Sequence, residues 1–157
     1  MTAGLAGRRE PSRPPLEEYG LTEVRVSEAQ PWPGRIGWYP AGAPPGYFYG
    51  AFGPYQHEVI ALARGDAITA HAEWYRMRQP GWAALADIGV SEADRGRGLG
   101  QYLLDKALWA MAREGFQAVE LHTHTAKNAL ACGMYLRRGF TIAERWVTLQ
   151  KVVEAER

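Results

Sequence analysis

The sequence lacks the features of several protein classes. It holds one cysteine, Cys132, which excludes an internal disulfide and is typical of a reducing compartment. No apolar run approaches the roughly 18 residues needed to span a bilayer, and Arg8 and Arg9 are not followed by the apolar core of a signal peptide. A formal net charge of +1 gives no electrostatic case for nucleic-acid binding. By elimination, we expect a cytoplasmic protein that has neither a membrane nor a nucleic acid as partner.

The length and composition favour one globular domain. A chain of 157 residues, 46% of them hydrophobic, is long enough for a substantial core. Residues 1–18 are rich in Gly, Ala, Arg and Pro without periodicity, which predicts a flexible tail before a single domain at 19–157. Residues 28–56 combine Pro and Gly with aromatic residues, so no helix is expected there.

The rest of the pattern alternates strands with helices. Short apolar runs predict strands, and turn residues such as Gly65-Asp66 separate them. Apolar residues recur at helical spacing from Leu99 to Met111, and Gly115 ends that pattern. The expected strands cover 21–26, 58–64, 67–77, 82–90, 116–125 and 140–153, and the expected helices cover 99–114 and 129–138. This order predicts an α/β (α+β) fold with helices packed on a mixed sheet.

A glycine-rich stretch, Arg95-Gly96-Arg97-Gly98-Leu99-Gly100, stands between the strand ending at Val90 and the next helix. Glycines let the backbone approach a ligand closely, and the N–H groups at a helix start attract an anion. A P-loop is excluded, because Gln101-Tyr102 follows in place of Lys-Ser or Lys-Thr. A dinucleotide fingerprint is excluded, because its third glycine and later acidic residue are missing. The stretch therefore predicts a site for a phosphate-bearing ligand of another kind.

Three motifs in fixed order carry a family resemblance. They are Asp87-Ile88-Gly89-Val90 at a strand end, Arg95-x-x-Gly98-x-Gly100 before a helix, and Asn128-x-x-Ala131-x-x-x-Tyr135-x-x-x-Gly139-Phe140 after one more strand. Over about residues 57–150 the chain thereby resembles the GNAT superfamily of acetyl-CoA-dependent N-acetyltransferases. The resemblance implies a mixed, mostly antiparallel sheet with a splayed central strand pair and flanking helices. It also implies transfer of an acetyl group from acetyl-CoA to a primary amine of a small molecule or peptide, by direct attack in a ternary complex. Some members pair two such units, so a homodimer is left open.

The resemblance assigns several residues to acetyl-CoA. The open strand edge at Ile88, Gly89 and Val90 would hydrogen-bond the pantetheine arm, and the amide of Val90 would stabilise the thioester oxygen as it gains charge. Asn128 would contact the pantetheine or order the splayed strand. The backbone amides that would hold the pyrophosphate belong to Arg95, Gly96, Arg97, Gly98, Leu99 and Gly100.

Residue type alone leaves alternatives for three of these side chains. Arg95 also fits a solvated arginine, and Arg97 fits a plain surface residue. Asn128 also fits an ordinary helix cap, because a side-chain oxygen at that position commonly accepts a hydrogen bond from the first helical turn.

Amide formation requires a neutral amine and assistance to the departing thiolate. Tyr135 follows Asn128 by seven residues, where the family carries its tyrosine acid, so the resemblance makes Tyr135 a catalytic residue and a coenzyme A contact. A free phenol (pKa ~10) is a weaker acid than a free thiol (~8.5), so we expect a hydrogen bond to the developing thiolate with late proton transfer. The alternative is a core tyrosine on an amphipathic helix.

The general base is less clearly marked. Family members often carry Glu or His on the strand before Val90, but Ala84 and Ala86 occupy those positions, and strand alternation places Asp87 on the opposite face. We expect His124 to serve, because imidazole has a suitable pKa, although it also fits a structural histidine. A water chain is another alternative, as are three other side chains: His122, Glu73 and His71. The histidines lack a clear fourth ligand for structural zinc, so no metal is expected.

Two functional classes stay open at this stage. The first is the N-acetyltransferase. The second is a non-catalytic acyl-CoA-binding regulatory module, suggested by Ala84 and Ala86 at the base positions and by the atypical segment 28–56. That segment is either a lid that selects the acceptor through its aromatic side chains or a cover for the sheet. Tyr135 favours the enzyme, because a pure binding protein has no use for a tyrosine acid.

Overall fold

The computed structural model describes residues 1–27, 35–36, 57–124 and 128–145. Its strands form one sheet in the order β1-β7-β6-β5-β4-β2, and β3 pairs with β5 outside this path. The strands are β1 (Thr2–Gly4), β2 (Thr22–Ser27), β3 (Arg35–Ile36), β4 (His57–Arg64), β5 (Ala67–Arg76), β6 (Trp82–Val90) and β7 (Ala118–Glu120). The helices are α1 (Leu99–Arg113) and α2 (Ala129–Leu136), with the 3-10 turns η1 (Leu16–Tyr19) and η3 (Glu92–Asp94). Pairing is antiparallel except between β6 and β7 and between β3 and β5, so the predicted fold class is confirmed.

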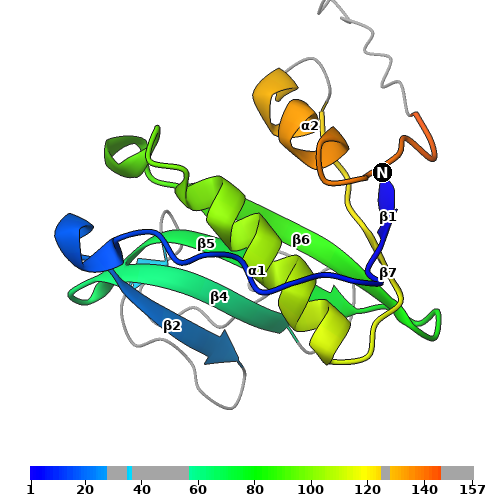
Figure 1. Ribbon diagram of the computed structural model, residues 1–157, viewed down its shortest axis with the longest axis horizontal. Helices are drawn as coiled ribbons and strands as arrows, with labels where there is room; N and C mark the ends of the chain where they lie inside the picture. Colours follow the sequence, from blue (N-terminus) through cyan, green and yellow to red (C-terminus); the bar gives the residue numbers. More distant parts are fainter. Residues whose placement is uncertain (28–34, 37–56, 125–127, 146–157) are drawn as a thin grey trace, which may run out of the picture.

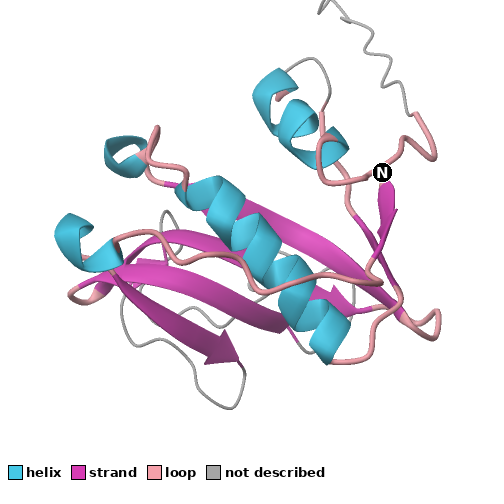
Figure 2. Cartoon of the chain, viewed as in Figure 1, coloured by secondary structure: helices cyan, strands magenta, loops and turns pink. Residues whose placement is uncertain are grey.

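Helix α1 lies across one face of the sheet (Figure 1). Its apolar stripe is fully buried and packs against side chains from β4, β5 and β6 in one core. The members of that core on α1 include Leu99, Leu103, Leu104, Leu108 and Met111. Helix α2 lies away from this layer, beside the end of the sheet where β1 and β7 are found (Figure 2). Among the helices of the described residues, none has the length and apolar character needed to cross a membrane.

The central strands separate after a short parallel contact. Strands β6 and β7 pair from Trp82 opposite Ala118 to Ala84 opposite Glu120. Beyond this point β6 continues to Val90, while the chain after Glu120 is no longer in a strand. The expected strand over 116–125 is therefore much shorter than predicted, and the splay expected from the family resemblance is present.

A β-bulge interrupts β6. Glu73 of β5 pairs with Asp87, but the next residue, Trp74, pairs with Leu85. Ala86 is thus an extra residue that β5 does not match, and a bulge of this kind resets which face each neighbouring side chain occupies.

The bulge corrects one prediction about the faces of β6. Tyr75 and Glu73 share a face of β5, and their partners on β6 are Ala84 and Asp87. The expectation that Ala84 lies on the face of Val90 is wrong, because strict alternation holds only in a strand without a bulge. Asp87 does lie opposite to the α1 face, as predicted.

The first residues form part of the sheet rather than a flexible tail. Strand β1 pairs antiparallel with β7, and Leu5 and Leu16 are buried in the α1 core. Between them, Glu10 accepts a hydrogen bond from Lys106 of α1 at 2.5 Å. The tail prediction is corrected here, because two isolated leucines in a Pro- and Arg-rich stretch show no periodicity although both find apolar partners.

Two other predicted segments are described only in part. Of the strand expected over 140–153, Thr141 forms an isolated antiparallel bridge with Thr2, and residues 146–153 lie outside the described residues. The aromatic segment 28–56 also lies outside them, apart from Arg35–Ile36 in β3. Its predicted role therefore stays a prediction.

Candidate active site

A cavity of about 320 Å³ occupies the splay between β6 and the chain after β7. Its walls come from Leu85 to Val90 of β6, from Leu121 to His124, and from α2. Gly100 of α1 and Tyr135 of α2 also line it. The cavity thus brings together residues from all three predicted motifs.

The edge of β6 beyond Ala84 supplies one wall. Ile88, Gly89 and Val90 all line the cavity and are partly exposed. On its other side β6 pairs with β5 through Val90 opposite Ala70, so the splay leaves the far edge turned towards the cavity. An extended ligand with amide groups can pair with such an edge as an added strand does.

The glycine stretch forms the turn into α1. Gly96 and Gly98 have φ angles of 79° and 74°, which are strained for residues with a side chain. Gly98 is the N-cap of α1 and has no side chain to cap the helix. The first amides of α1 therefore receive no side-chain hydrogen bond from the N-cap. Together with the positive end of the helix dipole, they make a favourable place for phosphate.

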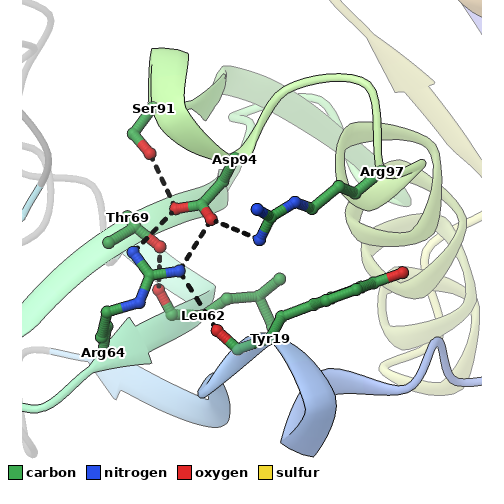
Figure 3. Close-up of polar contacts among 7 residues, drawn as sticks. All are labelled: Tyr19, Leu62, Arg64, Thr69, Ser91, Asp94 and Arg97. Carbon is green, nitrogen blue, oxygen red and sulfur yellow. Dashed lines mark hydrogen bonds and ion pairs between the residues drawn. The ribbon is translucent and has the colours of Figure 1, made fainter.

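The buried carboxylate of Asp94 makes the polar contacts that fix the start of this turn (Figure 3). Asp94, only 1% exposed, accepts hydrogen bonds from Arg64 at 2.7 and 3.2 Å and from the Ser91 hydroxyl at 2.9 Å. The Arg64 guanidinium lowers the pKa of the Asp94 carboxyl, with help from Ser91 and Thr69, against the opposing effect of burial. Asp94 thus ties the start of the glycine turn to β4.

The two arginines of the glycine stretch differ in their contacts. Arg97 donates a hydrogen bond to Asp94 at 3.1 Å, and its guanidinium lies 5.0 Å from the centre of the Tyr19 ring. Arg95 is exposed and donates to the carbonyl oxygen of Val90 at 3.2 Å. Arg97 is therefore held towards the protein, whereas Arg95 stays beside the open end of β6.

Tyr135 lies on α2 and is only 5% exposed. Its ring packs against that of Phe140, with the centres 5.7 Å apart. Burial, together with smaller electrostatic contributions first from Asp87 and then from Cys132, raises the pKa of Tyr135 to about 12. The phenol is therefore a stable hydrogen-bond donor at neutral pH.

Asn128, His122 and His124 also line the cavity, and all three are exposed. Asn128 is the N-cap of α2 but makes no side-chain cap hydrogen bond, so the plain capping interpretation does not describe its side chain. His124 contributes its backbone oxygen to the Asn128 amide at 2.9 Å. His122 lies 3.6 Å from a carboxylate oxygen of Glu120.

Two histidine–carboxylate pairs occupy the sheet face opposite α1. The His57 Nδ1–H donates to Glu73 Oε1 at 2.6 Å, and the His71 Nε2–H donates to Asp87 Oδ2 at 2.9 Å. The carboxylates are direct partners across β5 and β6. His71 and Glu73 are both 1% exposed, so neither reaches the cavity by itself. Among the described residues, no three such side chains come close enough to hold a metal ion.

Sequence reasoning missed the contacts of Asp94 and of Asp87. Asp94 gains its importance from Arg64, thirty positions earlier, and no local signal marks that contact. Asp87 was placed on the correct face, but its pairing with His71 depends on the register of two strands and on the bulge at Ala86. Short-range patterns carry neither kind of information.

Comparison with known proteins gives one family. The sequence model described as "Acetyltransferase (GNAT) family" matches residues 15–140. The mycothiol acetyltransferase of Corynebacterium glutamicum strain R is 30% identical over 135 residues, covering 86% of this chain. The chain spans 39% of the length of that relative.

Solved structures show the same fold. An aminoglycoside acetyltransferase from an uncultured soil sample, in complex with sisomicin, has a TM-score of 0.54 at 13% identity and covers 88% of this chain and 99% of its own. The acetyltransferase YycN of Bacillus subtilis has a TM-score of 0.51 at 25% identity, covering 62% of this chain and 63% of its own.

Proposed function

Because this chain belongs to the GNAT family of acetyltransferases, we propose that it moves an acetyl group from acetyl-CoA to a primary amine of a small molecule. Family membership supports an acyltransferase enzyme over a non-catalytic binding module. One observation supports the proposal most strongly: a single cavity is lined both by Gly100, in the first turn of α1, and by Tyr135 of α2. The relatives named for mycothiol and aminoglycosides favour a small molecule over a peptide as acceptor.

The residues at the end of β6 fit the donor. Bound acetyl-CoA would supply an activated acyl group as a thioester. The amides from Arg95 to Gly100 would hold its pyrophosphate, with the Arg95 side chain adding positive charge. The edge at Ile88, Gly89 and Val90 would pair with the pantetheine amides, and the Val90 amide would face the acyl oxygen. Asn128, whose side chain makes no cap bond, would steady the pantetheine from α2.

Tyr135 would act as a hydrogen-bond donor to the leaving thiolate. With the Tyr135 pKa raised to about 12, transfer of its proton to a thiolate of pKa ~8.5 is uphill by roughly 5 kcal/mol. The phenol therefore stabilises the developing negative charge on sulfur without giving up its proton, in place of the late proton transfer that the free pKa values led us to expect. The proton that ends on the thiol then comes from the attacking nitrogen.

The proposal is tested with a free-thiol release assay and acetyl-CoA as donor. The panel contains L-alaninamide, glucosamine, n-butylamine, a polyamine, an aminoglycoside and a peptide N-terminus. We expect thiol release that depends on at least one amine, with the acetylated product confirmed by mass spectrometry. Saturable acetyl-CoA binding without release for any amine would contradict the proposed transfer while leaving the binding site intact.

A further inference from the structure

The two histidine–carboxylate pairs differ in their access to the cavity. The Glu73 side chain is 1% exposed and bonds a histidine that is 4% exposed. The Asp87 side chain is 22% exposed, although His71 behind it is 2% exposed. Asp87 also lines the cavity, whereas Glu73 does not. One pair is therefore sealed inside the protein, and the other presents one carboxylate at the wall of the site.

The bulge at Ala86 explains this difference. It lies between the partners of Trp74 and Glu73, so the sheet pairing is locally irregular immediately before Asp87. Bulges are a common way to aim a side chain beside an active site. Asp87 is also within electrostatic reach of Tyr135, because its charge contributes to the raised pKa of that phenol. The carboxylate and the phenol therefore belong to the same site.

We propose that Asp87 is the acceptor-side catalytic residue, which binds the acceptor nitrogen as an ammonium and takes its proton, and that His71 is a positioning residue that holds the carboxylate. The inference rests on the proposed function, since it names the base of the same acetyl transfer. The His71 Nε2–H bonds Asp87 Oδ2, and the Asp87 side chain is 22% exposed at the cavity wall, where an ammonium group can reach the carboxylate. A charge-assisted hydrogen bond from an ammonium to this carboxylate is stronger than a neutral one.

The transfer balances with Asp87 in this role. The ammonium gives one proton to Asp87, and the neutral nitrogen forms a bond to the acyl carbon of the thioester. The carbon–sulfur bond breaks, and a second proton from the nitrogen leaves with the sulfur as free thiol. Asp87 then returns its proton to water. The sum is ammonium plus thioester giving amide, thiol and one proton.

A carboxylate base also indicates the class of amine. Carboxyl groups are weak bases, so acceptors that lose a proton easily are favoured. An α-amino group has a reference pKa near 7.7–8.0 and a lysine-like amine near 10.4, so at pH 7 the α-amine has roughly 300-fold more of its neutral form. We therefore infer a small amine of the α-amino type as acceptor, in preference to an alkylamine.

Other ionisable groups face Asp87 and bear on any pH profile. Glu73 is its direct partner on β5, and His71 bonds it from the same strand. Tyr135 of α2 lines the same cavity, and the charge of Asp87 contributes to its raised pKa. His122 and His124 line the cavity from the segment after β7. Because Glu73 lies directly across the strand pair and has its own histidine, it offers a matched control.

The test compares Asp87→Asn with Glu73→Gln in acetyl transfer to L-alaninamide and to hydroxylamine. Hydroxylamine is already neutral at pH 7 and needs no base before attack. Asp87→Asn should lower kcat/KM for L-alaninamide by about 100-fold, yet lower that for hydroxylamine by less than about 5-fold. Glu73→Gln should change both by less than about 5-fold. Acetyl-CoA affinity should be unchanged in both variants.

His71 is tested with a conservative pair. His71→Gln retains an N–H donor towards Asp87 and should keep activity within about 10-fold, whereas His71→Leu should approach the loss seen for Asp87→Asn. Equal losses in Asp87→Asn and Glu73→Gln, or equal losses with both nucleophiles, would overturn the assignment. If the unaltered protein transfers no acetyl group to any amine, the proposed function itself fails, which is a separate result.

A measurement on the unaltered protein guards against a variant that does not fold. Lactamide has a hydroxyl in place of the amine of L-alaninamide, so it cannot form the ammonium–carboxylate contact. The inhibition constant of lactamide should be at least about 10-fold higher than the KM of L-alaninamide. Equal apparent affinities would show that no carboxylate binds the acceptor nitrogen, and would contradict the role of Asp87.

Discussion

At the Val90 end of β6 the carboxylate of Asp94 is enclosed by two arginines, whereas nearer the middle of the strand the carboxylate of Asp87 bonds His71 and stays partly exposed. The first arrangement neutralises a charge inside the protein and fixes the shape of a turn. The second keeps a charge at the wall of the cavity. We therefore expect changes at the glycine turn to alter donor affinity, and changes around Asp87 and Tyr135 to alter the rate of transfer.

Among the remaining tests, the largest effect is expected at Tyr135, where a change should alter the rate of transfer. Tyr135→Phe removes the hydrogen bond to the leaving thiolate and should lower kcat by about 100-fold. Acetyl-CoA affinity, measured by calorimetry, should change by less than about 3-fold, because the phenyl ring keeps the packing against Phe140. A weaker affinity with unchanged kcat would place Tyr135 on the donor side instead.

The raised pKa of Tyr135 adds a pH test. Its folded value of about 12 exceeds the reference value of ~10, so the phenol stays protonated until the pH approaches the higher value. Titration of Tyr135 should therefore cause no loss of activity between pH 9 and 10.5, and the pH profiles of the unaltered protein and of Tyr135→Phe should have the same shape in this range. A loss in that range that the variant abolishes would contradict the assigned role.

The next effect is expected at Asp94, on the donor side. Asp94→Asn should weaken acetyl-CoA binding by about 10-fold and lower the free energy of unfolding by about 1–3 kcal/mol, because Arg64 and Arg97 lose their charged partner. The kcat at saturating donor should stay within about 3-fold. Calorimetry, steady-state kinetics and urea unfolding measure the three quantities.

Acid pH and a second ion pair serve as controls for Asp94. Because the Asp94 pKa is lowered in the folded protein, its stabilisation is present above the reference pKa of ~3.9 and is lost as the pH falls through the native value. The stability difference between Asp94→Asn and the unaltered protein should therefore shrink in acid. Glu114→Gln removes an ion pair with Arg25 at the other end of α1 and should leave acetyl-CoA affinity unchanged.

A smaller effect is expected at Gly98. The glycine has a φ of 74°, and an added Cβ would meet no atom within 4 Å, so the cost of Gly98→Ala is backbone strain of about 1–2 kcal/mol. The turn should relax away from its binding shape and weaken acetyl-CoA affinity by about 5-fold. Gly115→Ala is matched in strain, with a φ of 87° and open space, but lies at the far end of α1. Equal affinities in the two variants would contradict the proposed phosphate site.

The smallest effect is expected at His124. Its side chain is exposed at the cavity wall, so His124→Ala should lower kcat/KM by less than about 3-fold if Asp87 takes the acceptor proton. A loss that matches Asp87→Asn would return the role of base to His124, as residue type alone suggested.

The elements that carry the proposed donor site could be predicted from the sequence. The glycine stretch, Asn128 and Tyr135 are close in sequence to the elements that carry them, so local rules for turns and helices place them. Which face of β6 each side chain near Asp87 occupies could be predicted only in part, because the bulge at Ala86 adds one residue to an otherwise regular strand.

Contacts between distant residues could not be predicted. The pairing of β1 with β7 joins residues more than a hundred positions apart, and Asp94 depends on Arg64 from another strand. Such contacts are fixed by sheet order and register, which hydrophobic periodicity does not specify. The buried leucines of the first residues show the same limit, since each is isolated in its own sequence neighbourhood.

Calorimetric titration with coenzyme A tests the central claim most directly. The unaltered protein should give a saturable, one-to-one heat, and Gly98→Glu should lose that heat because a negative side chain would stand at the start of α1. No heat for the unaltered protein, or an equal heat for Gly98→Glu, would contradict a coenzyme A site at the glycine turn.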